Sequence, residues 1–202
     1  MTNTAVFVDR DGVINRNRLD HVKTWSEFEF LPGSREGLAI LTEHGYRIFV
    51  ITNQAVINRG LVARETVEEI NRRMIEETRR LGAKIESVLY CPHQPEEACG
   101  CRKPKPGLLL QARDRFGLDL RRSYLIGDHE TDLAAGVAAG CTTVLVLTGR
   151  ASLLSYLGSP LARASLVAQD LRESAKLIVT SDQRLVSVTS HQPLITSHCK
   201  KE

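Results

Sequence analysis

The chain has 202 residues, of which 42% are hydrophobic and 25% charged, and its formal net charge at pH 7 is +3. These values are typical of one globular domain, with or without a short appendage, and they exclude a collagen-like or wholly disordered chain. So small a charge excess predicts neither nucleic-acid nor membrane binding, and no apolar run approaches the roughly 18 to 20 residues that span a bilayer. Because the first residues also lack an export signal, we expect a soluble, cytoplasmic protein with reduced cysteines.

Short apolar segments alternate with amphipathic segments along the first 150 residues, and this alternation predicts an α/β fold. The predicted strands are continuously apolar and rich in β-branched residues, as in strands buried on both faces; they are residues 5–8, 47–51, 87–90, 123–126 and 143–147. The predicted helices have apolar stripes and end at glycines; they are residues 34–44, 64–81, 106–116 and 130–139. Ser34 is expected to cap the first helix and Pro106 to open the third. We therefore expect three layers, with helices on both faces of a central parallel sheet.

The sequence beyond Arg150 carries weaker signals. Residues 166–168 predict a last strand, and residues 171–179 predict a last helix. Residues 180–202 are rich in Ser, Thr and His without helical periodicity, and we interpret them as a poorly ordered C-terminal tail that follows a domain of residues 1–179. The possible metal ligands of this tail are interpreted as incidental; they are His191, His198 and Cys199.

Polar residues follow the predicted strands at the points where the strands end. The first strand runs into Asp9-Arg10-Asp11-Gly12, the second into Thr52-Asn53-Gln54 and the fourth into Gly127-Asp128, while Arg102-Lys103 follows the third. An isolated Asp after a strand is usually a turn or cap residue. Four polar clusters at one edge of a parallel sheet, where ligands of such sheets bind, instead favour a functional site.

The charges of these residues indicate the chemistry of the site. Asp9, Asp11 and Asp128 would repel one another unless a cation neutralised them, and oxygen ligands without His suit Mg²⁺. Lys103 and the hydroxyl of Thr52 would then face the same phosphate. A carboxylate nucleophile, a second carboxylate, a lysine and Mg²⁺ together predict a phosphoryl-transfer site.

Three of the five cysteines lie within eleven positions. Together with a histidine they form a Cys-x-His pair and a Cys-x-Cys pair; the four residues are Cys91, His93, Cys99 and Cys101. This composition predicts a closed, structural Zn²⁺ site, with a disulfide or free thiols as the alternatives. The metal would organise a loop that is too short to form its own core and that directly precedes Arg102 and Lys103. Cys141, within an apolar run, is interpreted as a core residue.

These motifs resemble those of the haloacid dehalogenase (HAD) superfamily of phosphatases. The matching residues occur in the expected order; they are Asp9-x-Asp11-Gly12, Thr52-Asn53, Lys103 and Gly127-Asp128-x-x-x-Asp132. The resemblance implies that Asp9 attacks phosphorus to form an aspartyl-phosphate, and that Asp11 protonates the leaving oxygen and then activates water. It also implies that Thr52 and Lys103 stabilise the transferring phosphoryl group. Mg²⁺ would be held by Asp9, the backbone carbonyl of Asp11 and Asp128, with Asp132 in a supporting structural role.

The segment CPHQPEEACGCRKPKPG is similar to the zinc loop of one branch of this superfamily, which contains D-glycero-D-manno-heptose 1,7-bisphosphate 7-phosphatases and histidinol-phosphate phosphatases. The resemblance covers about residues 4–150, and DRDGVIN and TNQAVINRG favour the heptose enzymes because Asn15 and Arg59-Gly60 match their patterns. His129 stands where these enzymes commonly carry Lys, and Ala55 stands where Ser is usual. The implied substrate contacts are Asn53, Gln54, Arg59, Arg102 and His129.

The resemblance implies a monomeric, Mg²⁺-dependent phosphomonoester hydrolase acting on a small phosphorylated sugar, with structural Zn²⁺ and no large cap domain. Residues 17–25 could lie over the site, where Trp25 would either contact the sugar or pack the loop. Arg102 is expected to contact the second phosphate or the sugar, with surface solvation as its alternative. The rival functions are a phosphatase for histidinol phosphate or another small phosphomonoester and a non-catalytic zinc-stabilised binding module. A dinucleotide oxidoreductase is disfavoured because no G-x-G-x-x-G follows the first strand.

Overall fold

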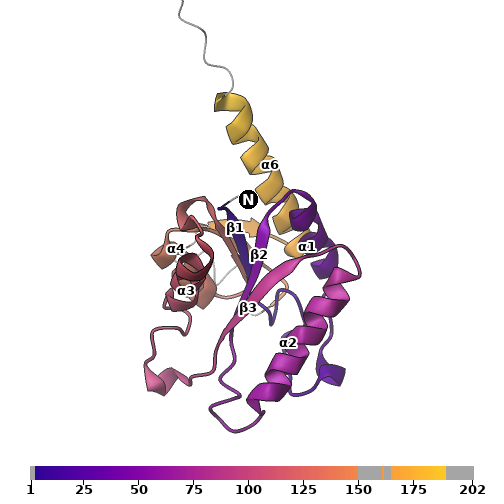
Figure 1. Ribbon diagram of the computed structural model, residues 1–202, viewed down its shortest axis with the longest axis vertical. Helices are drawn as coiled ribbons and strands as arrows, with labels where there is room; N and C mark the ends of the chain where they lie inside the picture. Colours follow the sequence, from indigo (N-terminus) through magenta and orange to yellow (C-terminus); the bar gives the residue numbers. More distant parts are fainter. Residues whose placement is uncertain (1–2, 150–160, 162–164, 190–202) are drawn as a thin grey trace, which may run out of the picture.

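The computed structural model describes residues 3–149, 161 and 165–189. A six-stranded parallel sheet forms its centre, in the order β3-β2-β1-β4-β5-β6 (Figure 1). The strands are β1 (Ala5–Val8), β2 (Arg47–Asn53), β3 (Ile85–Cys91), β4 (Tyr124–Gly127), β5 (Thr142–Val146) and β6 (Ser165–Ala168). Since successive strands are added on one side of β1 and then on the other, the chain changes direction between β1 and β4, which is where ligands bind in doubly wound sheets.

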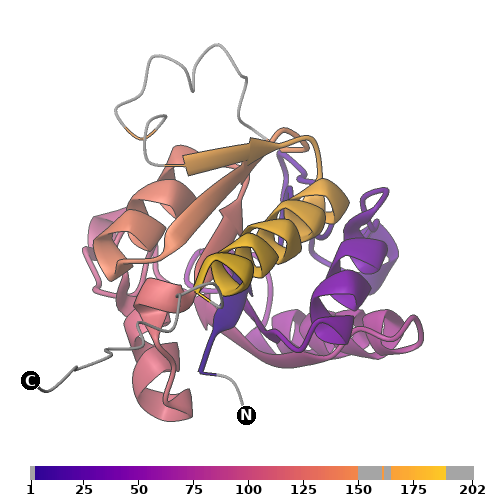
Figure 2. The ribbon, with the colours of Figure 1, turned by 90° about the horizontal axis from the view of Figure 1, so that it is seen from above.

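Helices cover both faces of the sheet, as predicted from the sequence. One face carries α1 (Ser34–Glu43), α2 (Arg64–Arg79) and α6 (Leu171–Thr189), and the other carries α3 (Gly107–Phe116) and α4 (Glu130–Ala139) (Figures 1 and 2). Successive residues of a strand point to opposite faces. In β1, for example, Val6 and Val8 pack in the core beneath α1, α2 and α6, while Ala5 and Phe7 pack in the core beneath α3. Burial on both faces explains why the central strands β1, β2, β4 and β5 read as continuous apolar runs.

The ends of two helices differ from the prediction. Ser34 does not cap α1, because Gly33 occupies the cap position with φ 76°, a left-handed conformation that favours glycine. Ser34 is instead the first helical residue, and its buried hydroxyl has no hydrogen-bond partner among the described residues. Leu81 does not extend the apolar stripe of α2, since that helix ends at Arg79 and Leu81 is 50% exposed.

Helix α6 is longer than predicted, since it continues past Val179 to Thr189. Beyond Val179, Asp182 anchors the helix by accepting hydrogen bonds of 2.5 Å from the hydroxyls of both Tyr46 and Tyr124. The helix therefore continues ten residues past the predicted end of the domain at residue 179. The division into a domain and a poorly ordered tail stays a prediction. The candidate ligands of the tail lie outside the described residues, as they belong to residues 190–202. Among the helices that the structure describes, none is both long enough and apolar enough to cross a bilayer.

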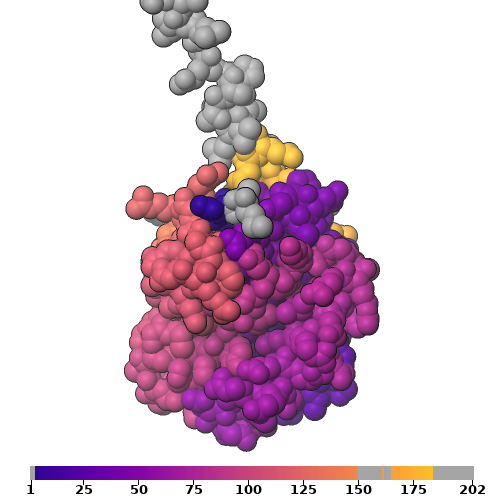
Figure 3. Space-filling view, viewed as in Figure 1, coloured from indigo at the N-terminus to yellow at the C-terminus, as the bar shows by residue number. Residues whose placement is uncertain are grey.

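Two loops meet beyond the carboxyl ends of β2 and β3, on the face seen in Figure 3. The side-chain amide of Asn58, after β2, donates to both carboxylate oxygens of Glu97, after β3. The amide of Gln94 donates in return to the carbonyl of Asn58. These contacts join the Cys/His loop to the loop that follows Thr52-Asn53-Gln54, at the edge of the sheet where the polar clusters gather.

Candidate active site

A cavity of about 470 Å³ opens at the carboxyl edge of the sheet. All the residues predicted to be catalytic, to contact substrate or to hold Mg²⁺ line it; they are Asp9, Asp11, Thr52, Asn53, Gln54, Arg59, Arg102, Lys103, Asp128 and His129. Asp132 lines it as well. The topology thus brings together polar clusters that lie more than a hundred residues apart in the sequence.

The base of the cavity holds three carboxylates and one ammonium group. Each of Asp9, Asp128 and Asp132 offers an oxygen, and these oxygens lie within 4.8 Å of one another. The Nζ atom of Lys103 lies 2.8 Å from Asp9 Oδ1 and 2.6 Å from Asp132 Oδ1. It also donates to the carbonyl of Ile51 at 3.0 Å. The ammonium group of this almost wholly buried side chain is therefore held in place by three hydrogen-bond acceptors.

Burial and crowding shift the pKa values of this cluster. Burial raises the pKa of Asp9 to about 8, because the attraction of Lys103 does not offset burial and the repulsion by Asp132 and Asp128. Burial alone would lower the pKa of Lys103, but Asp132 and Asp9 hold it above its ordinary value, so this side chain stays charged. One lysine cannot neutralise three carboxylates, and the site therefore favours the entry of a second cation.

The donor set suits Mg²⁺, a hard cation that prefers carboxylate and carbonyl oxygens. Asp9, Asp128 and Asp132 each offer an oxygen to such an ion, and Asp132 also contacts Lys103 and accepts from the backbone N–H of His129 at 3.1 Å. The backbone closes tightly around Asp128. A Cβ atom at Gly12 would lie 2.4 Å from Asp128 Oδ2, and one at Gly149 would lie 1.9 Å from it.

The carboxylate of Asp11 is held apart from this acidic cluster by three side-chain donors. Asn15 donates to Oδ1 at 2.9 Å, and Arg10 and Gln54 donate to Oδ2 at 2.9 and 2.8 Å. Burial acts to raise the pKa of Asp11, but the Arg10 charge and the hydrogen bonds outweigh it and hold that pKa below its usual range. In the free protein Asp11 is therefore ionised.

The residues that end β2 fix their neighbours in the site. Gln54 bridges two of them, because its amide donates to Thr52 Oγ1 at 2.9 Å as well as to Asp11. Asn53 pairs with the backbone of Lys103: its amide donates to the carbonyl and its Oδ1 accepts from the N–H, each at 3.1 Å. Asn53 and Gln54, predicted as substrate contacts, thus also position the lysine and Asp11.

The mouth of the cavity is basic. Arg59 Nη1 lies 3.3 Å from His21 Nε2, and Arg102 donates to the carbonyl of His93 at 3.1 Å. The ring nitrogen Nδ1 of His129 accepts from the backbone N–H of Thr131 and so caps α4. The mouth of the cavity therefore carries the positive charges of Arg59 and Arg102, whereas its base carries the carboxylates of the acidic cluster.

The loop after β1 lies over the cavity, as one of the two sequence interpretations proposed. Its lining residues are Asn17, Arg18, Leu19, His21 and Val22. Trp25 is not among them; it stacks on Phe28 and meets the edge of Phe30, so the packing interpretation of Trp25 is the one that the structure supports. Arg18 and His21 belong to the segment 17–25 that was expected over the site, but they were not predicted individually because a loop has no periodicity that would indicate the direction of its side chains.

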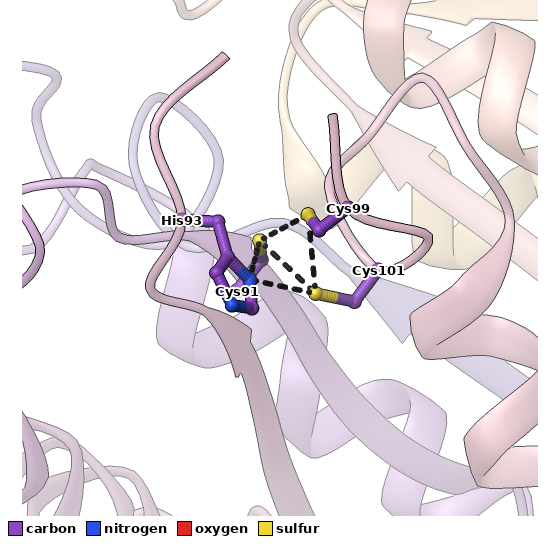
Figure 4. A group of neighbouring side chains, drawn as sticks. All are labelled: Cys91, His93, Cys99 and Cys101. Carbon is purple, nitrogen blue, oxygen red and sulfur yellow. Dashed lines mark hydrogen bonds between the residues drawn. The ribbon is translucent and has the colours of Figure 1, made fainter. Parts of the chain in front are cut away.

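The four zinc-ligand candidates form a separate cluster next to the cavity (Figure 4). Their side chains point toward one another, with sulfur and nitrogen atoms 3.2 to 3.6 Å apart. A zinc–sulfur distance of about 2.3 Å places the corners of a tetrahedron about 3.8 Å apart, close to this arrangement. All cysteines of the described residues are free thiols, which excludes a disulfide there, and the four donors fit Zn²⁺. Cys141 is buried in the core, as predicted.

Comparison with known proteins identifies the family. Residues 100–174 match the HAD-hydrolase-like family. The chain is 37% identical over 179 residues to the D-glycero-beta-D-manno-heptose-1,7-bisphosphate 7-phosphatase of Pseudomonas aeruginosa, covering 89% of this chain and 99% of that protein. The chain belongs to this phosphatase family. The resemblance inferred from the sequence motifs is thereby confirmed.

Other heptose-bisphosphate phosphatases agree. The Helicobacter pylori (strain J99) enzyme is 42% identical over 148 residues, or 73% of this chain and 84% of that protein. The crystal structure of the D,D-heptose 1,7-bisphosphate phosphatase from B. bronchiseptica, complexed with magnesium and phosphate, superposes with a TM-score of 0.83 at 32% identity. The match covers 88% of this chain and 99% of that one, so the two proteins share one fold over nearly their whole lengths.

Proposed function

We propose that the protein is a Mg²⁺-dependent phosphatase that removes the 7-phosphate of D-glycero-β-D-manno-heptose 1,7-bisphosphate. The observation that carries this proposal is the buried meeting of Asp9, Lys103 and Asp128 at the base of one cavity. Relatives bearing this name, at 33 to 42% identity, support the choice of substrate.

In the first half of the reaction, Asp9 acts as the nucleophile. A carboxylate oxygen of Asp9 forms a bond to phosphorus, and the bond from phosphorus to the sugar oxygen breaks, leaving its electron pair on that oxygen. The proton that this oxygen needs comes from the carboxyl of Asp11. Because Asp11 is ionised in the free protein, it must take up this proton before or during substrate binding, which the negative charge of a phosphate group favours.

In the second half, water attacks the phosphorus of the aspartyl-phosphate. Asp11 accepts the proton of that water, and the bond to Asp9 breaks with its electron pair returning to the carboxylate, so phosphate is released. Asp9 is then a carboxylate again, and Asp11 returns to its ionised form when it releases its proton to solvent. Lys103, fixed by Asp9 and Asp132, and the Thr52 hydroxyl would stabilise the transferring phosphoryl oxygens. Mg²⁺, held by Asp9, Asp128 and the carbonyl of Asp11, would neutralise the carboxylates and polarise the phosphoryl group.

The basic mouth of the cavity favours a substrate with a second anionic group. Arg18, Arg59 and Arg102 all line the cavity, and a guanidinium fork matches phosphate. The 1-phosphate of the heptose would be attracted by these side chains. Histidinol phosphate instead carries an ammonium group at its other end, which they would repel.

The test is phosphate release from the two substrates. We expect kcat/KM for the heptose bisphosphate to exceed that for histidinol phosphate by about 100-fold, since a charged hydrogen bond contributes about 1.5–3 kcal/mol. Arg102→Met should reduce this preference while leaving hydrolysis of a simple aryl phosphate unchanged. A preference for histidinol phosphate would contradict the proposed substrate. A failure to release phosphate from any ester with Mg²⁺ would instead favour the non-catalytic binding module.

We further propose that the Cys/His cluster holds structural Zn²⁺ and that the enzyme acts as a monomer in the cytoplasm. The free thiols support a reducing compartment. The monomer is supported by the cavity, because a complete set of catalytic groups comes from one chain. Light scattering of the purified protein tests the oligomeric state, and metal analysis tests the zinc.

A further inference from the structure

Arg10 is a cation that the proposed reaction does not use. It lies between the two catalytic aspartates in the sequence, and it is the largest of the fully buried side chains, with only 1% of its surface exposed. Burying a guanidinium group is costly unless its hydrogen bonds are satisfied. Both terminal nitrogens donate to groups from different parts of the molecule, whereas Nε has no partner among the described residues, so the role of the side chain lies at the two ends of its fork.

One end of the fork holds Asp11. Arg10 Nη2 lies 2.9 Å from Asp11 Oδ2 and 3.2 Å from Oδ1, so a single nitrogen contacts both carboxylate oxygens. The Asp11 side chain remains 23% exposed at the cavity while this contact holds it. The guanidinium therefore restricts the carboxylate without covering it.

The other end of the fork is tied to helix α2. Arg10 Nη1 donates at 3.0 Å to the Oδ1 atom of Asn71, which is only 5% exposed and does not line the cavity. Within the described residues, the hydrogen bond to Arg10 is what links Asn71 to the reacting groups. The order of contacts is therefore from the helix to Asn71, from Asn71 to Arg10, and from Arg10 to Asp11.

We infer that Asn71 and Arg10 are positioning residues that hold the Asp11 carboxyl in register with the leaving oxygen of the substrate. The inference rests on the proposed function, in which Asp11 is the proton donor. This positioning role requires the guanidinium fork, because a planar guanidinium can bridge two fixed acceptors whereas a lysine presents a single flexible point charge.

The leaving group distinguishes positioning from a merely structural role. An alkoxide such as that of a sugar needs a proton as its bond to phosphorus breaks, whereas p-nitrophenolate departs without one. A displaced Asp11 should therefore slow the cleavage of an alkyl phosphate much more than the release of nitrophenol. A loss of folded protein would lower both rates equally, so their ratio is independent of the folded fraction.

The experiment compares Asn71→Leu, Arg10→Lys and the wild type on heptose bisphosphate and p-nitrophenyl phosphate. Because general acid catalysis contributes about 10²- to 10⁴-fold, we expect both variants to lower kcat for the alkyl substrate by about 10- to 100-fold with little change in KM. The rate of nitrophenol release in the first turnover of the aryl substrate should change by less than about threefold. Asn71→Asp, which keeps an acceptor oxygen at the same place, should recover most of the alkyl rate.

Thr78→Val is the matched control, since Thr78 is a buried α2 residue whose hydroxyl donates to backbone carbonyls of its own helix. It should leave the alkyl-to-aryl ratio at the wild-type value. An equal fall on both substrates in Asn71→Leu, or a wild-type ratio in Arg10→Lys, would overturn the inference. If the wild type hydrolyses the aryl ester but not heptose bisphosphate, the proposed substrate fails alone, and the ratio is then measured with glycerol phosphate as the alkyl ester.

Discussion

The oxygen cluster at the base of the cavity and the sulfur cluster beside it are built in opposite ways. Asp9, Asp128 and Lys103 come from distant points of the chain and meet because parallel strands end at one edge. The Cys/His cluster is contained within eleven consecutive residues, which run from the last residue of β3 into the loop that follows it. The first depends on the whole fold, while the second organises a segment that has little core of its own.

The two clusters also differ in what they leave open. The sulfur cluster offers four ligands to one ion, which closes a tetrahedral site. The oxygen cluster offers carboxylates beside a lysine, and a Mg²⁺ ion held by only two or three of them would keep positions for water and substrate. The two are joined in sequence, since Arg102 and Lys103 follow Cys101 directly. We therefore expect the structural metal to affect catalysis through position and the catalytic metal to act through charge.

The largest expected effect follows from Asp9→Asn, which should lower turnover by at least about 1,000-fold. The amide cannot attack phosphorus, but it has nearly the same shape, so folding, zinc content and Mg²⁺-dependent binding of substrate should persist. Phosphate release and isothermal titration with substrate measure the two properties. Turnover near the wild-type rate would show that the oxygen cluster is not the reaction centre.

The second prediction concerns the uncompensated charge. The pKa of Asp9 is about 8 in the folded protein and near its ordinary 3.8 when unfolded, so between these values the folded state binds a proton that the unfolded state has lost. The free energy of unfolding without Mg²⁺ should therefore fall as the pH rises from about 4 to 8, by a few kcal/mol from this residue, and should then level off. Mg²⁺ should remove most of the decline.

Asp9→Asn serves as the control for this prediction because it cannot titrate. The unfolding free energies of both proteins are measured by urea denaturation in magnesium-free buffer. The value for the variant minus that for the wild type should increase with pH, and taking this difference cancels the contribution of other titrating groups. Parallel curves for the two proteins would show that Lys103 compensates the charge of Asp9 fully.

The sequence predicted the oxygen cluster because two general rules suffice for it. Continuous apolar runs locate buried strands, and the ends of parallel strands share an edge, so Asp9, Thr52 and Asp128 were expected to meet. The sulfur cluster was predicted by spacing alone. In both clusters, the residues that were recognised in the sequence are the ones that carry the chemistry themselves.

The features that were missed depend on contacts between distant residues that have no local signature. Asn71 reads as one polar residue of an amphipathic helix, and only the structure places it against Arg10. The extension of α6 depends on Asp182 meeting two tyrosines from distant parts of the chain, Tyr46 just before β2 and Tyr124 in β4. Gly149 gives no sign in the sequence that it lies against Asp128. Sequence patterns thus indicate the reacting groups better than the groups that support them.

The third prediction tests the sulfur cluster. Cys99→Ser replaces a soft ligand by a hard one and should weaken zinc binding by at least about 10- to 100-fold. Because the loop would then no longer fix Arg102 and Lys103, kcat/KM should fall together with zinc content, whereas the affinity for Mg²⁺ should change little. Zinc content by metal analysis and the Mg²⁺ dependence of the rate check this separation. A fully active zinc-free variant would break the link between the two clusters.

The smallest expected effect comes from Gly149→Ala. The added methyl group would lie 1.9 Å from Asp128 Oδ2, so the carboxylate must move, and we expect about a tenfold weaker affinity for Mg²⁺ with zinc unchanged. Binding of Mn²⁺ to the resting protein, followed by electron paramagnetic resonance, measures this without turnover. Gly100→Ala is the matched control in the zinc loop, since a Cβ atom there meets nothing within 4 Å. If both variants bind Mn²⁺ and Zn²⁺ like the wild type, the close fit around Asp128 is not what sets the affinity of the oxygen cluster for its metal.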